Sequence, residues 1–246
     1  MSFEYKYTAI IVEPRKHKAI EFVLNNACEC LSNEWKVVLF HGIHNIEYSK
    51  LIVDKLNGIY NNRITLVNLN VDDLNNITYS EVFATKSIIY DYIDTDVFLV
   101  FQTDSMIIKK NAHLINDFLE YDYVGSPWLK TNYEPTKECD FIGNGGFSLR
   151  NKTKMLEIIE KVNWHEKSEI YKMEDLFFSR KYPGIDVKKP DYNKALEFCQ
   201  GEVFNELFFA CHQIWGFKAH NIPLYELFIS MHPEIKILED LQGVEV

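Results

Sequence analysis

Apolar runs of strand length alternate with helical patterns over the first hundred residues. Strands are predicted for four short, nearly continuous apolar runs, at 7–13, 35–42, 64–70 and from 97 onward. Between them, apolar residues recur at helical spacing over 16–31, 48–59 and 80–93. This alternation favours right-handed crossovers and a mainly parallel sheet covered by helices. The half at about 1–110 therefore has the pattern of a Rossmann-like nucleotide-binding unit.

The second half, about 111–246, has a less regular pattern. Short strands are predicted at 121–128 and 144–151, where Gly and Pro interrupt the apolar residues. Helices are predicted at 152–162, 174–182, 193–210 and 223–230, and 215–220 is expected to be a strand or a loop. No repeat, linker or low-complexity segment separates the halves, so a single domain over 1–246 is expected.

Composition and charge exclude several classes of protein. Hydrophobic residues make up 47% of the chain, enough for a sizeable core. The 26 Lys and Arg against 36 Asp and Glu give a net charge of −10, which argues against binding nucleic acid or anionic lipid non-specifically. The first twenty residues hold no secretory leader, and no apolar run approaches the roughly 18 residues of a membrane span. A soluble, cytoplasmic protein is expected.

Cysteine usage and phosphate-binding motifs narrow the choice further. The five cysteines have no spacing typical of a metal site, and we expect free thiols in a reducing compartment. Neither G-x-G-x-x-G after the first strand nor G-x-x-x-x-G-K-[ST] occurs. A dinucleotide dehydrogenase or a P-loop enzyme is therefore disfavoured.

The fourth predicted strand ends in an abruptly polar segment. "VFLVF" is followed by Gln102, Thr103, Asp104 and Ser105. In parallel sheets ligands lie just beyond the carboxyl ends of the strands, where a carboxylate can meet a metal ion or a phosphate. Asp104 could equally cap the next turn, because Asp and Ser are common there.

Two further motifs have both structural and chemical interpretations. "GNGGFSLRN" crowds glycines before a strand, which suits either a tight turn or the close approach of a ligand. Glu174 and Asp175 stand at the start of a predicted helix, where they favour the helix dipole. If that end faces a cleft, one of them could act as a general base toward a hydroxyl nucleophile. Taken singly, each motif is more often structural.

The motifs occur in an order that resembles the GT-A nucleotide-sugar glycosyltransferases. More closely, the chain resembles a glycosyltransferase-like family described only as a domain of unknown function. The matching stretches are "IIVEPR", "EWKVVLFHG", "VFQTDSM", "YDYVGSPW", "GNGGFSLRN" and "EDLFFS", all within 10–179. The resemblance implies an α/β, GT-A-like fold with a mainly parallel mixed sheet. It also implies a hexosyltransferase-like enzyme that moves a sugar from a UDP- or GDP-sugar to a hydroxyl acceptor on a glycan or protein, with inversion or retention left open.

The resemblance also implies a metal and phosphate site. GT-A enzymes bind a divalent cation, Mn²⁺ or Mg²⁺, through an Asp-x-Asp motif at this strand end. Here Asp104 matches the second Asp and Gln102 replaces the first, which removes one charge from the site. A His near the C-terminal end of the fold often adds a metal or phosphate contact, and "GFKAH" offers His220. Lys218 matches the same region and could neutralise phosphate directly.

The remaining site residues follow from the same resemblance. Glu13 and Arg15 would hold the nucleotide, although a surface ion pair is the alternative for them. Asp175 would be the catalytic base, with Glu174 capping the helix or touching the acceptor. The acceptor side would include Trp128, Asn144, Gly145, Gly146 and Glu202, and a core position is the alternative for the tryptophan.

Two rival functions stay open on the sequence. A sugar-nucleotide nucleotidyltransferase uses a related fold but normally carries a Gly-rich, basic loop after the first strand, and "EPRKHKA" contains no glycine. A non-catalytic sugar-binding module would have lost its metal and base. The replacement of an Asp by Gln102 is consistent with such a module, whereas the intact carboxylates of Glu174 and Asp175 argue against it.

Overall fold

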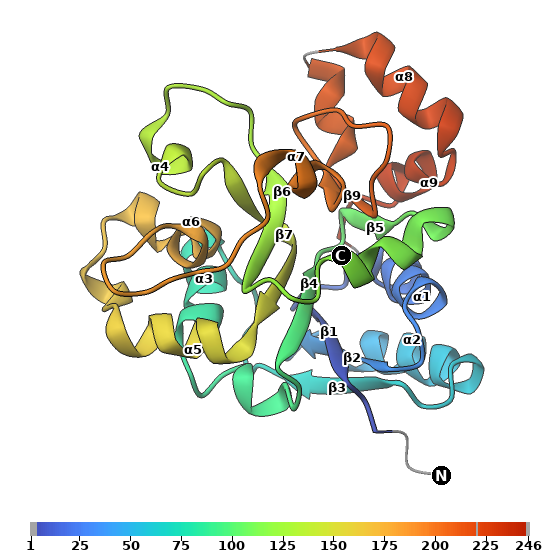
Figure 1. The fold of residues 1–246 in the computed structure, drawn as a ribbon. Coiled ribbons are helices and arrows are strands. Elements are labelled where there is room, and N and C mark those ends of the chain that lie inside the picture. The colour runs from blue at the N-terminus through green and yellow to red at the C-terminus, as the bar shows by residue number, and fades with distance from the viewer. Residues whose placement is uncertain (1–3, 220, 245–246) are drawn as a thin grey trace.

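A mixed six-stranded sheet of order β3-β2-β1-β4-β7-β6 forms the centre of the molecule (Figure 1). This structure is a computed structural model, and it describes residues 4–219 and 221–244. Four strands are mutually parallel: β1 (Tyr7–Val12), β2 (Trp35–His41), β3 (Ile64–Asn68) and β4 (Val97–Phe101). β7 (Ile142–Asn151) runs antiparallel to β4 and to β6 (Tyr123–Pro127). The predicted mainly parallel α/β sheet is thereby confirmed.

Helices cover both faces of this sheet (Figure 1). One face carries α1 (Ile20–Cys30) and α2 (Ile46–Ile59), and the other carries α3 (Asn76–Ala84), α5 (Lys152–Lys161) and α6 (Glu174–Ser179). Successive strand residues point to opposite faces, so Ile11 packs in the α1 core and Ile10 in the α3 core. Strands buried on both faces explain the nearly continuous apolar runs of the sequence.

The third helix begins earlier than its apolar pattern predicted. Asn75 accepts hydrogen bonds from the backbone N–H groups of Ile77 and Thr78, and the Thr78 hydroxyl accepts from the backbone of Asn75. This capping box fixes the start of α3 at Asn76, not at 80. The predicted C-terminal part of the helix is instead a short 3₁₀ turn, η1 (Tyr90–Tyr92).

The helix predicted over 193–210 is wrong. The segment forms a short helix, α7 (Tyr192–Leu196), and then two strands, β8 (Cys199–Gln200) and β9 (Ala210–His212). Five consecutive residues, 208–212, are buried, which is the pattern of a strand enclosed on both faces and not of an amphipathic helix. Together with β5 (Ser105–Ile107), these strands form a second sheet of order β5-β9-β8.

The C-terminal region is helical. The segment expected to be a strand or a loop is a 3₁₀ helix, η5 (Ile214–Ala219), and it is followed by the predicted α8 (Ile222–Met231) and by α9 (Glu234–Asp240), which the sequence analysis missed. The shorter elements are α4 (Glu134–Lys137), η2 (Lys109–Asp117), η3 (Trp164–Glu166) and η4 (Glu169–Lys172). Among the helices of the described residues, none combines the length and the apolar character that crossing a membrane requires.

Candidate functional site

Asp104 and His212 meet at the carboxyl edge of the central sheet. Asp104 lies in the turn between β4 and β5, and the pairing of β5 with β9 sets Ser105 opposite His212. This register brings His212 Nε2 to 3.2 Å from Asp104 Oδ1, with both side chains largely buried. The two atoms are not aligned as a hydrogen bond, and within the described part of the chain neither has another hydrogen-bond partner. Buried polar atoms without partners are rare, so this pair is a candidate ligand site.

The turn after β4 is capped by Ser105 and not by Asp104. The Gln102 N–H donates to Ser105 Oγ at 3.0 Å, and the Ser105 hydroxyl donates to the Gln102 carbonyl at 2.9 Å. The Asp104 carboxylate instead accepts a 2.7 Å hydrogen bond from Gln213 Nε2. Burial raises the pKa of Asp104, but His212 and Gln213 outweigh that effect and hold the pKa below its ordinary value. Asp104 is therefore an ionised carboxylate at neutral pH.

A small cavity of about 220 Å³ opens beside this pair at the ends of β1 and β4. Its lining includes four residues predicted to bind the nucleotide, Glu13, Arg15, Gln102 and Asp104. Tyr79 of α3 also lines it, and its hydroxyl accepts a 2.9 Å hydrogen bond from Gln102 Nε2. Residues that the resemblance assigned to one subsite thus border one cavity.

Glu13 holds the Arg15 side chain in a fixed orientation. Oε1 of Glu13 accepts from Arg15 Nε at 2.8 Å, and Oε2 accepts from Nη2 at 2.9 Å. The carboxylate is 4% exposed and the guanidinium side chain 43%, so this pair differs from the surface ion pair considered as its alternative. The forked geometry leaves a positioned cation at the rim of the cavity.

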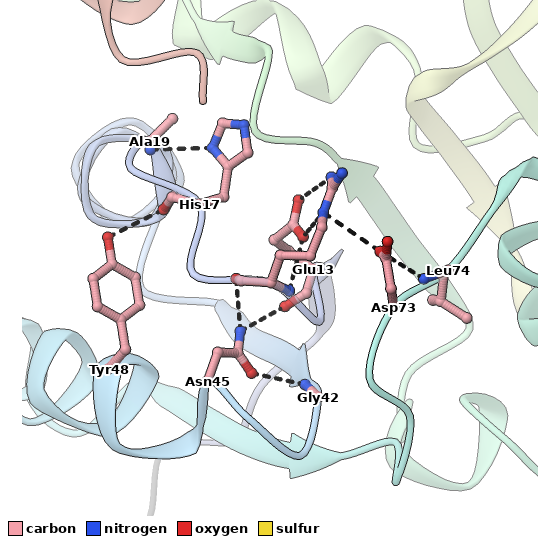
Figure 2. A network of polar contacts seen from close by, with 9 residues as sticks. Glu13, His17, Ala19, Gly42, Asn45, Tyr48, Asp73 and Leu74 are labelled. Carbon is pink, nitrogen blue, oxygen red and sulfur yellow. Dashed lines mark hydrogen bonds and ion pairs between the residues drawn. The ribbon is translucent and has the colours of Figure 1, made fainter. Parts of the chain in front are cut away.

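The loop that carries this pair is itself fixed by Asn45 (Figure 2). Asn45 Nδ2 donates to the carbonyls of Glu13 and Arg15, and its Oδ1 accepts from the Gly42 N–H at 2.8 Å. A side chain at Gly42 would place Cβ 2.6 Å from the carbonyl oxygens of Pro14 and Val71. Only glycine permits this close packing of the two loops.

The C-terminal segment closes one side of the same region. Gln242 Nε2 donates to the Thr103 carbonyl at 2.9 Å, next to Asp104. The Lys18 N–H donates to the Gly243 carbonyl at 3.0 Å. Residues after α9 therefore support both the turn after β4 and the loop after β1, and no sequence motif indicated this role.

Gly145 and Gly146 connect the Asp104–His212 pair with the carboxylates of α6. A Cβ on Gly145 would overlap the Glu174 carboxylate, and a Cβ on Gly146 would overlap the His212 ring. The glycine pair predicted from "GNGG" is thus required by two side chains of the protein itself. The absence of side chains at these two positions allows Glu174 of α6 and His212 of β9 to approach β7 closely.

Glu174 forms a buried ion pair with Arg150. Arg150 Nη2 lies 2.6 Å from Glu174 Oε2, and the guanidinium lies 4.8 Å from the centre of the Phe83 ring. Burial by itself would lower the pKa of Arg150, but the Glu174 carboxylate raises it. Ser80 of α3 caps the start of this helix, since the backbone N–H of Glu174 donates a hydrogen bond to Ser80 Oγ at 3.0 Å. These contacts fix the start of α6.

Asp175 lies beside this pair at a partly buried position. Its Oδ1 accepts a 2.7 Å hydrogen bond from the Leu176 N–H. Burial, and then the negative charge of Glu174, raise the pKa of Asp175 to about 7. A carboxyl group with a pKa near neutral suits proton transfer at physiological pH.

A second, larger cavity of about 610 Å³ lies on the other side of His212. His212 and Gln213 line it together with Asn144 and Glu202, two residues predicted on the acceptor side. Because Gln213 is bonded to Asp104, the Asp104–His212 pair stands between the two cavities.

Other predicted site residues have different surroundings. Trp128 is 8% exposed and packs in a small apolar cluster with Cys139 and Leu176, the core role considered as its alternative. Lys218 forms an ion pair with Glu239 of α9. His220, predicted as a metal ligand, lies outside the described residues.

His212 is the site residue that the sequence analysis missed. It was hidden because the preceding segment was assigned to a helix, whereas His212 is the last of the three buried residues of β9. A histidine at the end of a short apolar run was the available signal.

The Asp104–His212 pair fits a divalent cation in part. Asp104 Oδ1 and His212 Nε2, which face each other without a hydrogen bond, supply one carboxylate oxygen and one imidazole nitrogen, which Mn²⁺ accepts. The described residues contain no group of three or more His, Cys, Asp or Glu side chains arranged for a metal. A cation here would therefore need further ligands from water or from phosphate oxygens, as is common when a metal is bound together with a nucleotide.

Comparison with protein families places the chain. The model of a family described as "Protein of unknown function (DUF5672)" matches residues 63–220. The chain belongs to this family. No curated protein matches it.

Solved structures confirm the GT-A-type fold of this DUF5672 protein. The galactosyltransferase LgtC, in complex with donor and acceptor sugar analogs, aligns over 89% of the chain and 81% of its own with 14% identity and a TM-score of 0.53. The apo-form glycosyltransferase GlyE of Streptococcus pneumoniae TIGR4 aligns over 98% of the chain and 65% of its own, with 13% identity and a TM-score of 0.52.

A weaker similarity links the chain to mannosyltransferase PcManGT from Pyrobaculum calidifontis, in complex with GDP-Man and Mn²⁺. It covers 66% of the chain at 11% identity, with a TM-score of 0.44. The DUF5672 chain spans 48% of that mannosyltransferase.

Proposed function

We propose that this protein is a glycosyltransferase that moves a sugar from a nucleoside diphosphate sugar to a hydroxyl acceptor. The observation that carries the proposal is the Asp104–His212 pair, which stands between two cavities at the carboxyl edge of a GT-A-type sheet. One cavity would hold the nucleotide and the other the acceptor. The reacting sugar would then lie between them.

The donor side uses charge to hold a diphosphate. The Arg15 guanidinium, fixed by Glu13, would contact phosphate oxygens at the rim of the smaller cavity. Asp104 and His212 would hold a divalent cation such as Mn²⁺, which would neutralise charge on the departing diphosphate. Gln102, where other GT-A enzymes carry an Asp, would contribute an amide in place of a second carboxylate.

The acceptor side needs a group that removes a proton. Asp175 is our choice of base, because its pKa of about 7 leaves a large fraction both ionised and basic at neutral pH. In an inverting reaction, the acceptor oxygen would form the new bond to the anomeric carbon while the bond to the diphosphate breaks. The hydroxyl proton would pass to Asp175, and the electron pair of the broken bond would leave with the diphosphate. We assign Glu174 a positioning role through Arg150.

The test compares nucleotides by calorimetry. Uridine and guanosine mono- and diphosphates are titrated into the protein with and without Mn²⁺. One diphosphate should bind at least about tenfold more tightly than its monophosphate, and Mn²⁺ should widen the gap, because the second phosphate meets the cation. Equal affinity for the monophosphate and the diphosphate would contradict the diphosphate site and therefore the proposal.

The non-catalytic alternative makes a different prediction. A binding module would bind the same diphosphate sugar but would neither hydrolyse it nor transfer its sugar in the presence of Mn²⁺. Chromatography that detects the release of free nucleoside diphosphate distinguishes the glycosyltransferase from the binding module. The anomeric configuration of the product, read by NMR, then separates inversion from retention.

A further inference from the structure

The lining of the larger cavity combines polar and apolar residues. Its polar residues are Asn144, Glu202, His212, Gln213 and Asn221. Its apolar residues are Leu129, Val203, Phe204, Phe217 and Leu224. At about 610 Å³ the cavity is large enough for a drug-sized ligand, and a lining with both kinds of residue favours an amphipathic one.

The two phenylalanines of the lining, Phe204 and Phe217, pack against a third. Phe228 of α8 is 1% exposed. Its ring packs against Phe204 with centroids 5.4 Å apart and against Phe217 at 5.7 Å. Aromatic rings fixed in this way need little reordering when a ligand covers them, which favours binding.

The charge of the cavity selects against anions. Its lining, as far as the structure describes it, contains one carboxylate, Glu202, and neither lysine nor arginine. One Glu202 oxygen accepts a hydrogen bond from the Leu129 N–H at 3.1 Å, which ties the carboxylate to another residue of the lining. A phosphate or carboxylate group on the ligand would face this charge with no lysine or arginine of the lining to pair with, and like charges at close range are unfavourable.

We propose that the acceptor is an uncharged sugar linked to an apolar group, such as an aryl or alkyl aglycone. This inference rests on the proposed function and names its second substrate by class. The sugar hydroxyls contact Glu202 and Asn144 near His212, and the apolar group covers Phe204 and Leu224. Sugars also present an apolar ring face, which suits an aromatic wall.

The test measures acceptor binding directly. Methyl glycosides of glucose, galactose and mannose, their p-nitrophenyl glycosides, and the 6-phosphates of the same three sugars are compared by calorimetry and saturation-transfer NMR. At least one p-nitrophenyl glycoside should bind about tenfold or more tighter than its methyl counterpart, because the aryl group removes apolar surface from water. The 6-phosphates should bind more weakly than either. Equal binding of aryl and methyl glycosides, or preferred binding of a 6-phosphate, overturns the proposal.

Variants locate the binding in this cavity. Phe204→Ala should abolish the advantage of the aryl glycoside, and Glu202→Lys should raise the affinity for the 6-phosphate. Leu207→Ala is the matched control, because Leu207 is 46% exposed on the same segment and does not line the cavity. If Phe204→Ala does not fold, Glu202→Lys alone decides, since Glu202 is exposed and its replacement does not disturb the core. An unchanged profile in the folded variants overturns the assignment.

The outcome is separable from that of the proposed function. Binding of nucleoside diphosphate with Mn²⁺ tests the smaller cavity, and binding of aryl glycoside tests the larger one. Loss of the first with retention of the second would contradict the glycosyltransferase and leave a glycoside-binding cavity. Retention of the first with no glycoside binding would contradict only the acceptor class.

Discussion

Arg150 Nη2 and Glu174 Oε2 form a 2.6 Å ion pair whose side chains are 0% and 7% exposed. Removing one partner of a buried pair leaves an uncompensated charge and typically costs about 3–5 kcal/mol. Glu174→Gln, which keeps the shape of the side chain, should therefore lower the free energy of unfolding by about 3 kcal/mol. Urea denaturation, monitored by fluorescence, measures this change in the free energy of unfolding.

An exposed ion pair supplies the control for this variant. Glu120 and Lys188 are 67% and 52% exposed, so Glu120→Gln should change the free energy of unfolding by less than about 1 kcal/mol. A similar loss in both variants would mean that Glu174 is solvated in solution and that its pairing with Arg150 does not fix α6.

Asp175 should make transfer depend on pH. Its pKa is raised to about 7, so the fraction of ionised base, and with it the transfer rate, should rise with pH and level off above about 7. Asp175→Asn should keep the affinity for the nucleoside diphosphate and reduce transfer by about 10²–10⁴-fold. If this variant transfers sugar at the wild-type rate, another residue must act as the base, and Glu202 is the next candidate.

The same group should also make stability depend on pH. The unfolded carboxyl has a pKa near 3.8, so between about pH 4 and pH 7 the native state binds more protons than the unfolded state. The free energy of unfolding should therefore fall as pH rises through this window. Asp175→Asn removes this contribution, so the variant should gain stability relative to the wild type on going from pH 4 to pH 7. A constant difference across that range would contradict the raised pKa.

His212 should control the effect of metal on nucleotide binding. His212→Ala removes one of the two protein ligands that we propose for the cation and should weaken the Mn²⁺-dependent binding of nucleoside diphosphate by at least about tenfold. Binding without Mn²⁺ should change much less. The control is His113→Ala, a change at an exposed position on η2. If the two variants respond to Mn²⁺ alike, His212 is not a metal ligand.

Gln242 should affect the donor site although it lies near the C-terminus. Gln242→Ala removes the hydrogen bond to the Thr103 carbonyl, worth about 1 kcal/mol, and loosens the turn that carries Asp104. Nucleoside diphosphate affinity should fall several-fold. Lys236→Ala, on the exposed side of α9, should leave it unchanged. Unaltered affinity in the Gln242 variant would show that the turn is rigid without this contact.

The sequence predicted the sheet better than it predicted the site. Strands β1, β2 and β4 are buried on both faces, and the edge strand β3 still buries Ile64 and Val67, so their apolar runs were visible without tertiary information. β8 and β9 have two and three residues, too few for any periodicity, and the predicted helix replaced them. The error removed His212 from consideration.

Contacts between segments far apart in the chain could not be predicted from the sequence. Gln213 reaches Asp104 across 109 residues, through the pairing of β5 with β9. Likewise, "SLRN" and "MEDL" gave no sign that Arg150 and Glu174 pair, because that contact depends on how α6 packs on β7. The candidate residues near strand ends could be predicted, since their chemistry is local, but their partners could not.

The tight packing around Gly146 has an evolutionary consequence. A side chain at 146 would collide with the His212 ring, so position 146 can change only where the histidine is lost or displaced. A descendant that has lost His212 would be free to acquire alanine or serine at 146, whereas one that keeps the histidine must keep the glycine. Across the family, a residue larger than glycine at 146 should therefore mark lineages that no longer hold a histidine at this edge.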